Sequence, residues 1–392
     1  MDSTVNNCLL CGSDNLHEIE SFRELQTVSS DCKPAGDGFR FVSCGQCGHA
    51  QKTRDAHWQA AARDIYEQYD LYHQSAGKEQ VIFAAGDDTP RPRSQRLLER
   101  LNEHVQLPTQ GRMLDVGCGN GGMLRSFSSL HEGWRLAGSE LSNRFRDRVL
   151  SIPRVEEFYS DTLDTIHAEF DLITMLHVLE HVEEPVQLLV DAARLLQDDG
   201  SLLIQVPNLA ETPFDMLVAD HCSHFVPQRL LEVVDKAGLH VKAWSASWLS
   251  KELSVLVVKD PSVAAPCEAP EPISVERSRD LCSGHVRWLH ELVDRGRQLA
   301  ADSGGIGVFG TSIAGTWMAS QLGDIVRFFV DEDQTRIGGT HLGRPILSAA
   351  DVPAGDNVLI VLPPAIAARV QQRVQPQHGR SQFVAPAMLH AA

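Results

Sequence analysis

The segment Met-Leu-Asp-Val-Gly-Cys-Gly-Asn-Gly-Gly, residues 113 to 122, constrains the fold of this chain most strongly. Apolar residues lead into an aspartate and a glycine cluster, and the following Met-Leu-Arg-Ser-Phe indicates a helix. We therefore expect a strand, a glycine turn and a helix. Glycine can take a positive φ and lets a ligand approach the backbone closely. Free N–H groups at the helix start suit a polar or anionic group. The spacing matches neither the dinucleotide fingerprint nor a lysine-bearing P-loop.

Further strands follow at the intervals expected of an α/β sheet. The segment 134–140 predicts a second strand, and it ends in Glu140. Residues 158–161 end the next strand at Asp161, residues 170–177 predict a fourth strand that ends at His177, and residues 200–207 predict a fifth. The stretch 178–182 is expected to continue into a helix. A carboxylate at a strand end can accept hydrogen bonds from both hydroxyls of a ribose, which is the role expected for Glu140.

From Gly111 to Asp260 the order of these segments and their amino-acid sequences resemble those of class I S-adenosylmethionine (SAM) methyltransferases. The resemblance implies that the glycine turn holds the methionine part of SAM, that Glu140 holds the ribose and that Asp161 accepts from the adenine amino group. His177 would lie near the cofactor at the start of a helix. An unrelated α/β domain with coincidental glycines is the alternative. The predicted cofactor-binding residues are Asp115, Gly117, Gly119, Asn120, Glu140, Asp161, His177 and Tyr72.

Tyr72 is included because it belongs to the segment that precedes the first strand. Tyr66, Tyr69 and Tyr72 are spaced by three residues, so they share roughly one face of a helix predicted over 58–72. Such a stripe usually packs against other apolar residues. In methyltransferases, however, the segment before the first strand commonly closes over the cofactor, so both interpretations stay open.

The net charge of the chain indicates which classes of binding partner are excluded. There are 35 basic and 52 acidic residues, which leaves a net charge of −17, and no segment carries a basic stripe. This balance argues against DNA, RNA and anionic membrane surfaces as partners, although a few local arginines could still bind a phosphate. No apolar run is long enough to span a bilayer, and the first residues lack the pattern of a signal peptide. We therefore expect a cytoplasmic protein whose partner is a small molecule.

Four of the nine cysteines form two Cys-x-x-Cys pairs, Cys8 with Cys11 and Cys44 with Cys47. In a cytosolic chain two such pairs predict a zinc site with four thiolate ligands. The gap of about thirty residues between the pairs predicts a small β insertion. Redox-active dithiols are the alternative, but the thioredoxin-like context that they need is absent. A closed four-cysteine site has no open coordination position, so we expect a structural metal.

The C-terminal third begins after a proline-rich linker at 261–274. A long helix is predicted over 275–301, and 305–315 predicts a second strand, glycine turn and helix. Strands are expected at 328–331 and 358–362, which makes a smaller Rossmann-like domain. Because the full dinucleotide fingerprint is missing, a structural or substrate-holding role is favoured over a nicotinamide site.

The whole arrangement resembles sugar C-methyltransferases that act on nucleotide-linked deoxysugars. That family has an N-terminal zinc domain, a central SAM domain and a C-terminal Rossmann-like domain, with the substrate between the lobes. The family's Tyr-His-Glu-His-Phe stretch corresponds here to His-Cys-Ser-His-Phe, residues 221 to 225. The final histidine is therefore retained as His224, while His221 stands at the tyrosine position. The resemblance implies a nucleotide-sugar acceptor, with C-methylation and O-methylation both open.

Methyl transfer from a sulfonium is an in-line displacement, so the protein must orient the acceptor and remove its proton. Asp220, His221 and His224 follow the fifth strand, at the edge where α/β sheets bind their ligands. Histidine titrates near neutral pH, which makes His224 the first candidate base and His221 the second. These histidines could instead pack or cap a loop.

The predicted fold is an α/β protein with a doubly wound methyltransferase sheet, a small N-terminal zinc-binding domain and a C-terminal Rossmann-like domain. A non-sugar natural product is the alternative acceptor, and a SAM-binding module without turnover, engaging a protein, is the alternative function. The oligomeric state is open. The predicted divisions are 1–55 for the zinc-binding domain, 56–107 for a helical connector, 108–260 for the SAM domain, 261–274 for the linker and 275–392 for the C-terminal domain.

Overall fold

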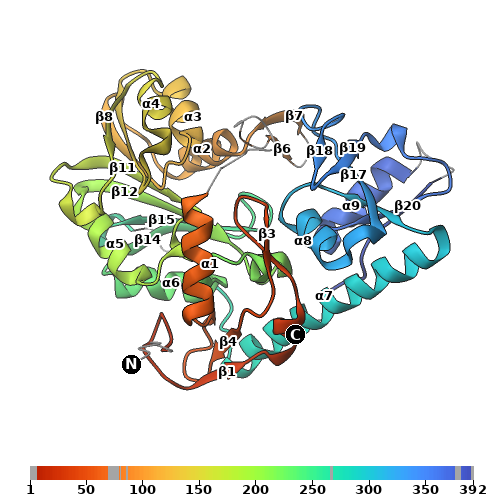
Figure 1. Cartoon of the computed structure of the whole chain (residues 1–392). Helices are drawn as coiled ribbons and strands as arrows, with labels where there is room; N and C mark the ends of the chain where they lie inside the picture. Colours follow the sequence, from red (N-terminus) through yellow and green to blue (C-terminus); the bar gives the residue numbers. More distant parts are fainter. Residues whose placement is uncertain are drawn as a thin grey trace. The chain divides into compact units, whose positions relative to one another are not determined.

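A computed structural model describes residues 7–68, 79, 81–84, 87–264, 268–375 and 381–389 of the chain (Figure 1). The chain is divided into two compact units. The first unit comprises Met1–Ser75, Ala210–Cys222 and Ser274–Ala392, and the second comprises Ala76–Leu209 and Ser223–Ile273. The first unit thus combines the cysteine-bearing N-terminal segment with the C-terminal segment, and the second contains the glycine turn.

The second unit is built on a seven-stranded sheet with the order β10-β9-β8-β11-β12-β15-β14. The first five strands are parallel, whereas β15 is antiparallel to both β12 and β14. From β8 the chain proceeds outward to β9 and β10 and then returns to β11, so the order reverses between β8 and β11. The strands are β8 (Gly111–Val116), β9 (Trp134–Ser139), β10 (Val155–Tyr159), β11 (Phe170–Leu176), β12 (Leu196–Pro207), β14 (His240–Ser245) and β15 (Glu252–Val258).

Helices cover both faces of this sheet, as Figure 1 shows. One face carries α2 (Arg93–His104), α3 (Gly122–Leu130) and α4 (Arg146–Leu150), and the other carries α5 (Pro185–Arg194) and α6 (Pro227–Lys236). The core beneath the first set includes Leu101, Met113, Phe127, Trp134 and Leu172, all 2% exposed or less. The parallel sheet is therefore buried on both faces, as βαβ crossovers require.

Two local expectations in this unit are wrong. The stretch after β11 forms only a short 3-10 helix, Leu179–His181, and the α-helix begins later at Pro185. Proline suits the first helical position because its missing N–H has no intrahelical partner there. The segment predicted as a helical connector also contains a hairpin of β6 (Val81–Ala84) and β7 (Asp87–Pro92).

The N-terminal part of the first unit is a small β structure. β1 (Leu16–Glu18), β4 (Phe41–Cys44) and β5 (Ala50–Lys52) form an antiparallel meander. A 3-10 helix (Glu20–Glu24) and the hairpin of β2 (Thr27–Val28) and β3 (Pro34–Gly36) lie between the cysteine pairs, so the predicted β insertion is confirmed. The helix α1 (Ala56–Glu67) follows, with the Asp55 side chain accepting a hydrogen bond from the N–H of Trp58.

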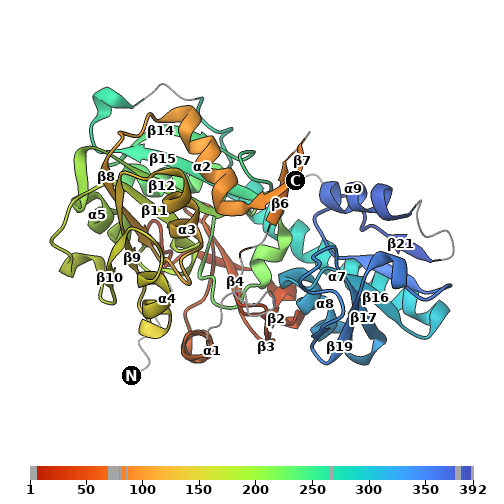
Figure 2. The ribbon, with the colours of Figure 1, turned by 90° about the horizontal axis from the view of Figure 1, so that it is seen from above.

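The C-terminal part of the first unit is a second open sheet, with the order β18-β19-β17-β16-β20-β21. Figure 2 shows α9 (Pro364–Val374) on one face and α7 (Val275–Ser303) and α8 (Ile313–Leu322) on the other. An open sheet with helices on both faces thus occupies the segment for which the sequence predicted a Rossmann-like domain. The strands are β16 (Ile306–Phe309), β17 (Val326–Val330), β18 (Thr340–His341), β19 (Arg344–Leu347), β20 (Asn357–Ile360) and β21 (Gln382–Val384).

A buried lysine holds the segment Ala210–Cys222 inside the first unit. Lys52 is fully buried, and its ammonium donates to the carbonyls of Val218 at 2.7 Å and His221 at 3.1 Å. The indole N–H of Trp58 donates to the carbonyl of Ala219 at 2.9 Å. These bonds satisfy backbone groups that would otherwise be buried without partners. A segment that follows β12 in sequence is therefore organised by side chains of the N-terminal part.

No helix among the residues that the structure describes has the length and apolar character needed to cross a membrane.

Lys52 should make stability depend on pH. Burial lowers the pKa of Lys52 to about 8, whereas an unfolded lysine titrates near 10.4. Between these values the unfolded state binds more protons, so stability rises with pH. We expect the free energy of unfolding of the parent, relative to Lys52→Met, to increase by roughly 2–3 kcal/mol between pH 7.5 and 10.5.

Urea unfolding of both proteins at the two pH values measures this difference. Ionisation of the other groups is common to parent and variant and cancels in the comparison. A difference that does not change with pH would show that Lys52 keeps its ordinary pKa.

Candidate functional site

The glycine turn lies at the carboxyl end of β8, where the strand order reverses. Gly117, Gly119 and Gly121 all have positive φ, at 66°, 48° and 85°. A Cβ atom at Gly117 would lie 2.4 Å from the Cγ2 atom of Val178, which is closer than any side chain could tolerate. Glycine is therefore required at this position by both conformation and space. Open α/β sheets bind their ligands at such a reversal, outside the carboxyl ends of the strands.

Glu140 follows β9 directly and reaches the glycine turn. Its Oε2 atom accepts a hydrogen bond from the N–H of Gly119 at 3.1 Å, and Oε1 accepts from the N–H of Leu141 at 3.0 Å. Burial is the main cause that raises the pKa of this carboxyl, and these backbone N–H groups oppose it. The structure therefore brings together the turn and the acid that the sequence analysis assigned to a ribose.

Asp115 and Asn120 lie beneath the turn, and the structure gives both side chains protein partners. Asp115 is 3% exposed and accepts from the hydroxyl of Thr174 on β11 at 2.6 Å. Burial raises the pKa of Asp115 to about 7. The Asn120 side chain is fully buried and accepts from Arg125 at 2.9 Å. Both residues therefore help to shape the turn from below.

His177 stands at the end of β11 in a left-handed conformation, with φ 55°. Its Nδ1 atom lies 3.0 Å from the buried carboxylate of Glu180, and Arg93 donates to its Nε2 atom at 2.5 Å. Arg93 also pairs with Glu252 on β15 at 2.7 Å. Sequence reasoning missed Arg93 and Glu252, because only the fold brings the start of α2 and the start of β15 close to His177.

Asp161 and Tyr72 are the other two residues that the sequence predicts to bind the cofactor. Asp161 follows β10 and is exposed, so its carboxylate is open to a ligand or to solvent. Tyr72 lies outside the described residues, and so does Tyr69. Tyr66, on α1, is 49% exposed.

The catalytic candidates are divided between the units. Asp220 and His221 belong to the first unit, and His224 belongs to the second, in the short strand β13 (Ser223–His224). Asp220 is fully buried and accepts from the N–H of Ser30 at 2.9 Å and from its hydroxyl at 2.5 Å. His224 is 1% exposed. Both oxygens of Asp220 thus hold the loop that carries Ser30, which is a structural arrangement.

His221 has a partner that the sequence analysis did not identify. Its Nδ1 atom lies 2.7 Å from Oδ1 of Asp215, and both side chains are nearly completely buried. A carboxylate at Nδ1 fixes which ring nitrogen carries the proton, which leaves Nε2 as the acceptor. Asp215 lies within the 3-10 helix Pro213–Leu217, six residues before His221, so no simple spacing rule marks it.

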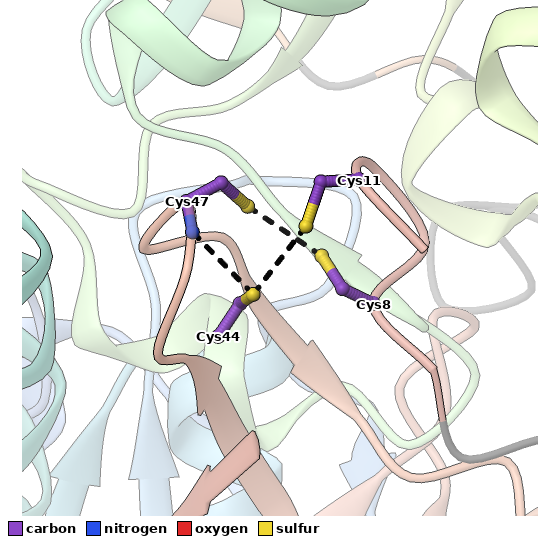
Figure 3. Close-up of side chains that lie close together, drawn as sticks. All are labelled: Cys8, Cys11, Cys44 and Cys47. Atoms are coloured by element: carbon purple, nitrogen blue, oxygen red, sulfur yellow. Dashed lines mark hydrogen bonds between the residues drawn. The ribbon is translucent and has the colours of Figure 1, made fainter. Parts of the chain in front are cut away.

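The four paired cysteines converge in the first unit. Figure 3 shows their side chains pointing toward one another from two loops. The sulfur of Cys8 lies 3.5 Å from that of Cys47, and the sulfur of Cys11 lies 3.6 Å from that of Cys44. All four sulfurs lie within 4.8 Å of one another. A tetrahedral zinc with bonds of about 2.3 Å sets its sulfurs about 3.8 Å apart, so the cluster fits this ion.

Backbone geometry around the cysteines also suits a metal knuckle. The N–H groups of Gln46 and Cys47 point at the sulfur of Cys44, at 3.4 and 3.5 Å. Gly12 and Gly48 have positive φ, at 75° and 77°, whereas Gly45 does not. A Cβ at Gly45 would lie 2.5 Å from the side-chain nitrogen of Asn15, so the Asn15 side chain would have to move.

Comparison with known proteins identifies the part of the chain that contains the glycine turn. Residues 90–243 match the family described as "Methyltransferase domain". The ubiquinone biosynthesis O-methyltransferase of Aromatoleum aromaticum is 29% identical over 109 residues, which are 25% of this chain and 44% of that protein. The protein of the same name from Xanthomonas oryzae is 30% identical over 132 residues, 30% of this chain and 52% of that protein.

The chain thus spans about half the length of the curated relatives it matches. Among solved structures, CalO1, a methyltransferase in calicheamicin biosynthesis, is 21% identical, with a TM-score of 0.35 over 41% of this chain and 52% of that one. The matched residues contain the glycine turn, Glu140 and the reversal between β8 and β11. The second unit therefore contains a class I SAM-dependent methyltransferase domain.

Proposed function

We propose that this protein transfers a methyl group from SAM to a carbon or oxygen atom of a nucleotide-activated sugar. The observation that supports it most directly is the hydrogen bond between Glu140 and the N–H of Gly119, which joins the predicted ribose acceptor to the glycine turn. The sugar class is supported by the resemblance in domain order and by the histidine-bearing stretch 221–225. The acidic balance of the chain supports a small molecule over nucleic acid or a membrane as its partner, and the site of action would be the cytoplasm.

SAM supplies a methyl group that is already activated for displacement. The residues of this chain then have two tasks, which are to orient the acceptor and to remove its proton. Glu140 would hold the ribose hydroxyls and Asp161 the adenine amino group. His224 would take the proton, and His221, oriented by Asp215, would orient the acceptor or serve as the base in its place.

A non-sugar acceptor is the second candidate, because the matched relatives are named as O-methyltransferases of ubiquinone biosynthesis. Incubation of the purified protein with labelled SAM and a panel of nucleotide sugars and phenolic acceptors separates the two. Label in a nucleotide sugar supports the proposal, and label in a phenol alone replaces it with the second candidate. SAM binding without any labelled product, even in a cell extract, would favour a module without turnover.

The Glu140 assignment predicts a specific binding defect. Glu140→Ala should weaken SAM binding about tenfold to a hundredfold, because hydrogen bonds to a charged acceptor are lost. Titration calorimetry measures the affinity, and Glu156→Ala on the exposed face of β10 is the matched control. Equal affinity in Glu140→Ala and Glu156→Ala would remove Glu140 from the site.

The base assignment predicts a kinetic defect. His224→Asn should keep its SAM affinity and lower the single-turnover rate of methyl transfer roughly a hundredfold or more, the usual scale for a positioned general base. His221→Asn should lower it less. The measurement is rapid quench at saturating SAM and acceptor. A His224→Asn rate within a few fold of the parent would shift the assignment to His221 or Asp220.

We also propose that Cys8, Cys11, Cys44 and Cys47 hold one structural zinc ion. Metal analysis of the purified chain should return about one zinc per chain. Cys44→Ser should lose the metal, whereas the control Cys32→Ser should keep it. Because structural zinc is coupled to folding, chelation should loosen the N-terminal part before SAM binding falls. Freshly purified protein without metal, and with four freely titratable thiols, would exclude the site.

A further inference from the structure

A third carboxylate, Glu79, lies beside Asp115 and Glu140 at the glycine turn of the second unit. The sequence analysis did not identify it. A Cβ atom at Gly122, the first residue of α3, would lie 3.4 Å from Oε2 of Glu79. Glu79 and Glu140 are both close enough to raise the pKa of Asp115, although burial is the larger cause. Three acidic side chains therefore surround one turn.

Glu79 is held in place by hydrogen bonds from Ser94. Its Oε1 atom accepts from the N–H of Ser94 at 2.8 Å, and Oε2 accepts from the Ser94 hydroxyl at 2.5 Å. Ser94 is 2% exposed. The carboxylate thus has a defined position at the start of α3, set by the second residue of α2.

Among the described residues, no ion pair balances the negative charge at the turn. Within the part of the chain that the structure describes, no lysine or arginine pairs with Glu79, Asp115 or Glu140. Arg125, on α3, instead donates to the backbone carbonyl and the side chain of Asn120. Partly buried acids that lack a cationic partner favour a ligand that carries positive charge.

The proposed cofactor, SAM, carries a positively charged ammonium group at its amino-acid end, and this end would reach the glycine turn. With its ribose at Glu140, the amino-acid end of SAM would reach the turn and the start of α3. The N–H groups of a helix N-terminus attract a carboxylate, so they would hold the carboxylate of SAM, and Glu79 would then face the ammonium on the same carbon. Resting on the function proposed above, we infer that Glu79 binds the α-ammonium of the cofactor and so selects ligands with an intact amino-acid end.

A purely structural role for Glu79 makes a different prediction. By accepting from Ser94, Glu79 caps α2, and its charge at the start of α3 is favourable to that helix dipole. Loss of a cap would lower stability and weaken every ligand alike. Loss of an ammonium contact would weaken only ligands that carry the ammonium.

Calorimetry with two ligands separates these roles. S-adenosylhomocysteine carries the ammonium, and its deaminated analogue lacks only that group. In the parent we expect the analogue to bind about tenfold to a hundredfold more weakly. In Glu79→Gln, which keeps an acceptor for the Ser94 N–H, S-adenosylhomocysteine should weaken by a similar factor and the analogue by less than twofold, so that the gap closes.

Glu103→Gln, an exposed change of the same charge on α2, is the matched control and should leave both affinities unchanged. Equal weakening of both ligands in Glu79→Gln, or no weakening of either, would overturn the inference. If Glu79→Gln does not fold, the measurement on the parent protein still tests the inference. Equal affinity of the parent for S-adenosylhomocysteine and for its deaminated analogue would overturn it. Failure of the parent to bind S-adenosylhomocysteine at all would instead count against the proposed function.

Discussion

The close passage of the backbone at Gly117 beneath Val178 is the constraint on which the methyltransferase domain depends. A side chain at Gly117 would collide with Val178 and would also need an unfavourable φ. Because the turn can form, the N–H of Gly119 is presented to Glu140. Beneath it the bond between Asp115 and Thr174 joins β8 to β11, the two strands between which the order reverses. Backbone conformation, strand pairing and the proposed cofactor contacts thus meet at one point.

The first unit shows how a segment can be separated from its sequence neighbours by polar contacts. Ala210–Cys222 follows β12 directly, yet its carbonyls are satisfied by Lys52 and Trp58 of the N-terminal part. Asp220 continues this pattern by accepting two hydrogen bonds from Ser30. The N-terminal part therefore sets the position of the segment that carries His221 and its partner Asp215.

The acidic residues of the chain serve different purposes according to their surroundings. Asp115 is buried against a hydroxyl, Asp215 faces an imidazole and Asp220 accepts from a serine, whereas Glu140 accepts from a backbone N–H of the glycine turn and Glu79 from the N–H of Ser94 on α2. Among the described residues, the carboxylates at the glycine turn pair with no lysine or arginine, whereas Asp215 faces the imidazole of His221.

The sequence by itself determined the strands β8 to β12 of the second unit, the position of the glycine turn, the cysteine pairs and the long helix and following strand of the C-terminal part. Those features are local: glycines, short apolar runs and cysteine spacings each act within a few residues. Sequence alone could not place Asp215 beside His221, Arg93 beside His177, or Glu79 at the start of α3. These contacts join residues on different elements, and only tertiary packing decides which of many buried polar groups meet. The burial of Asp220 has the same origin, because its partner Ser30 lies 190 residues away in the chain.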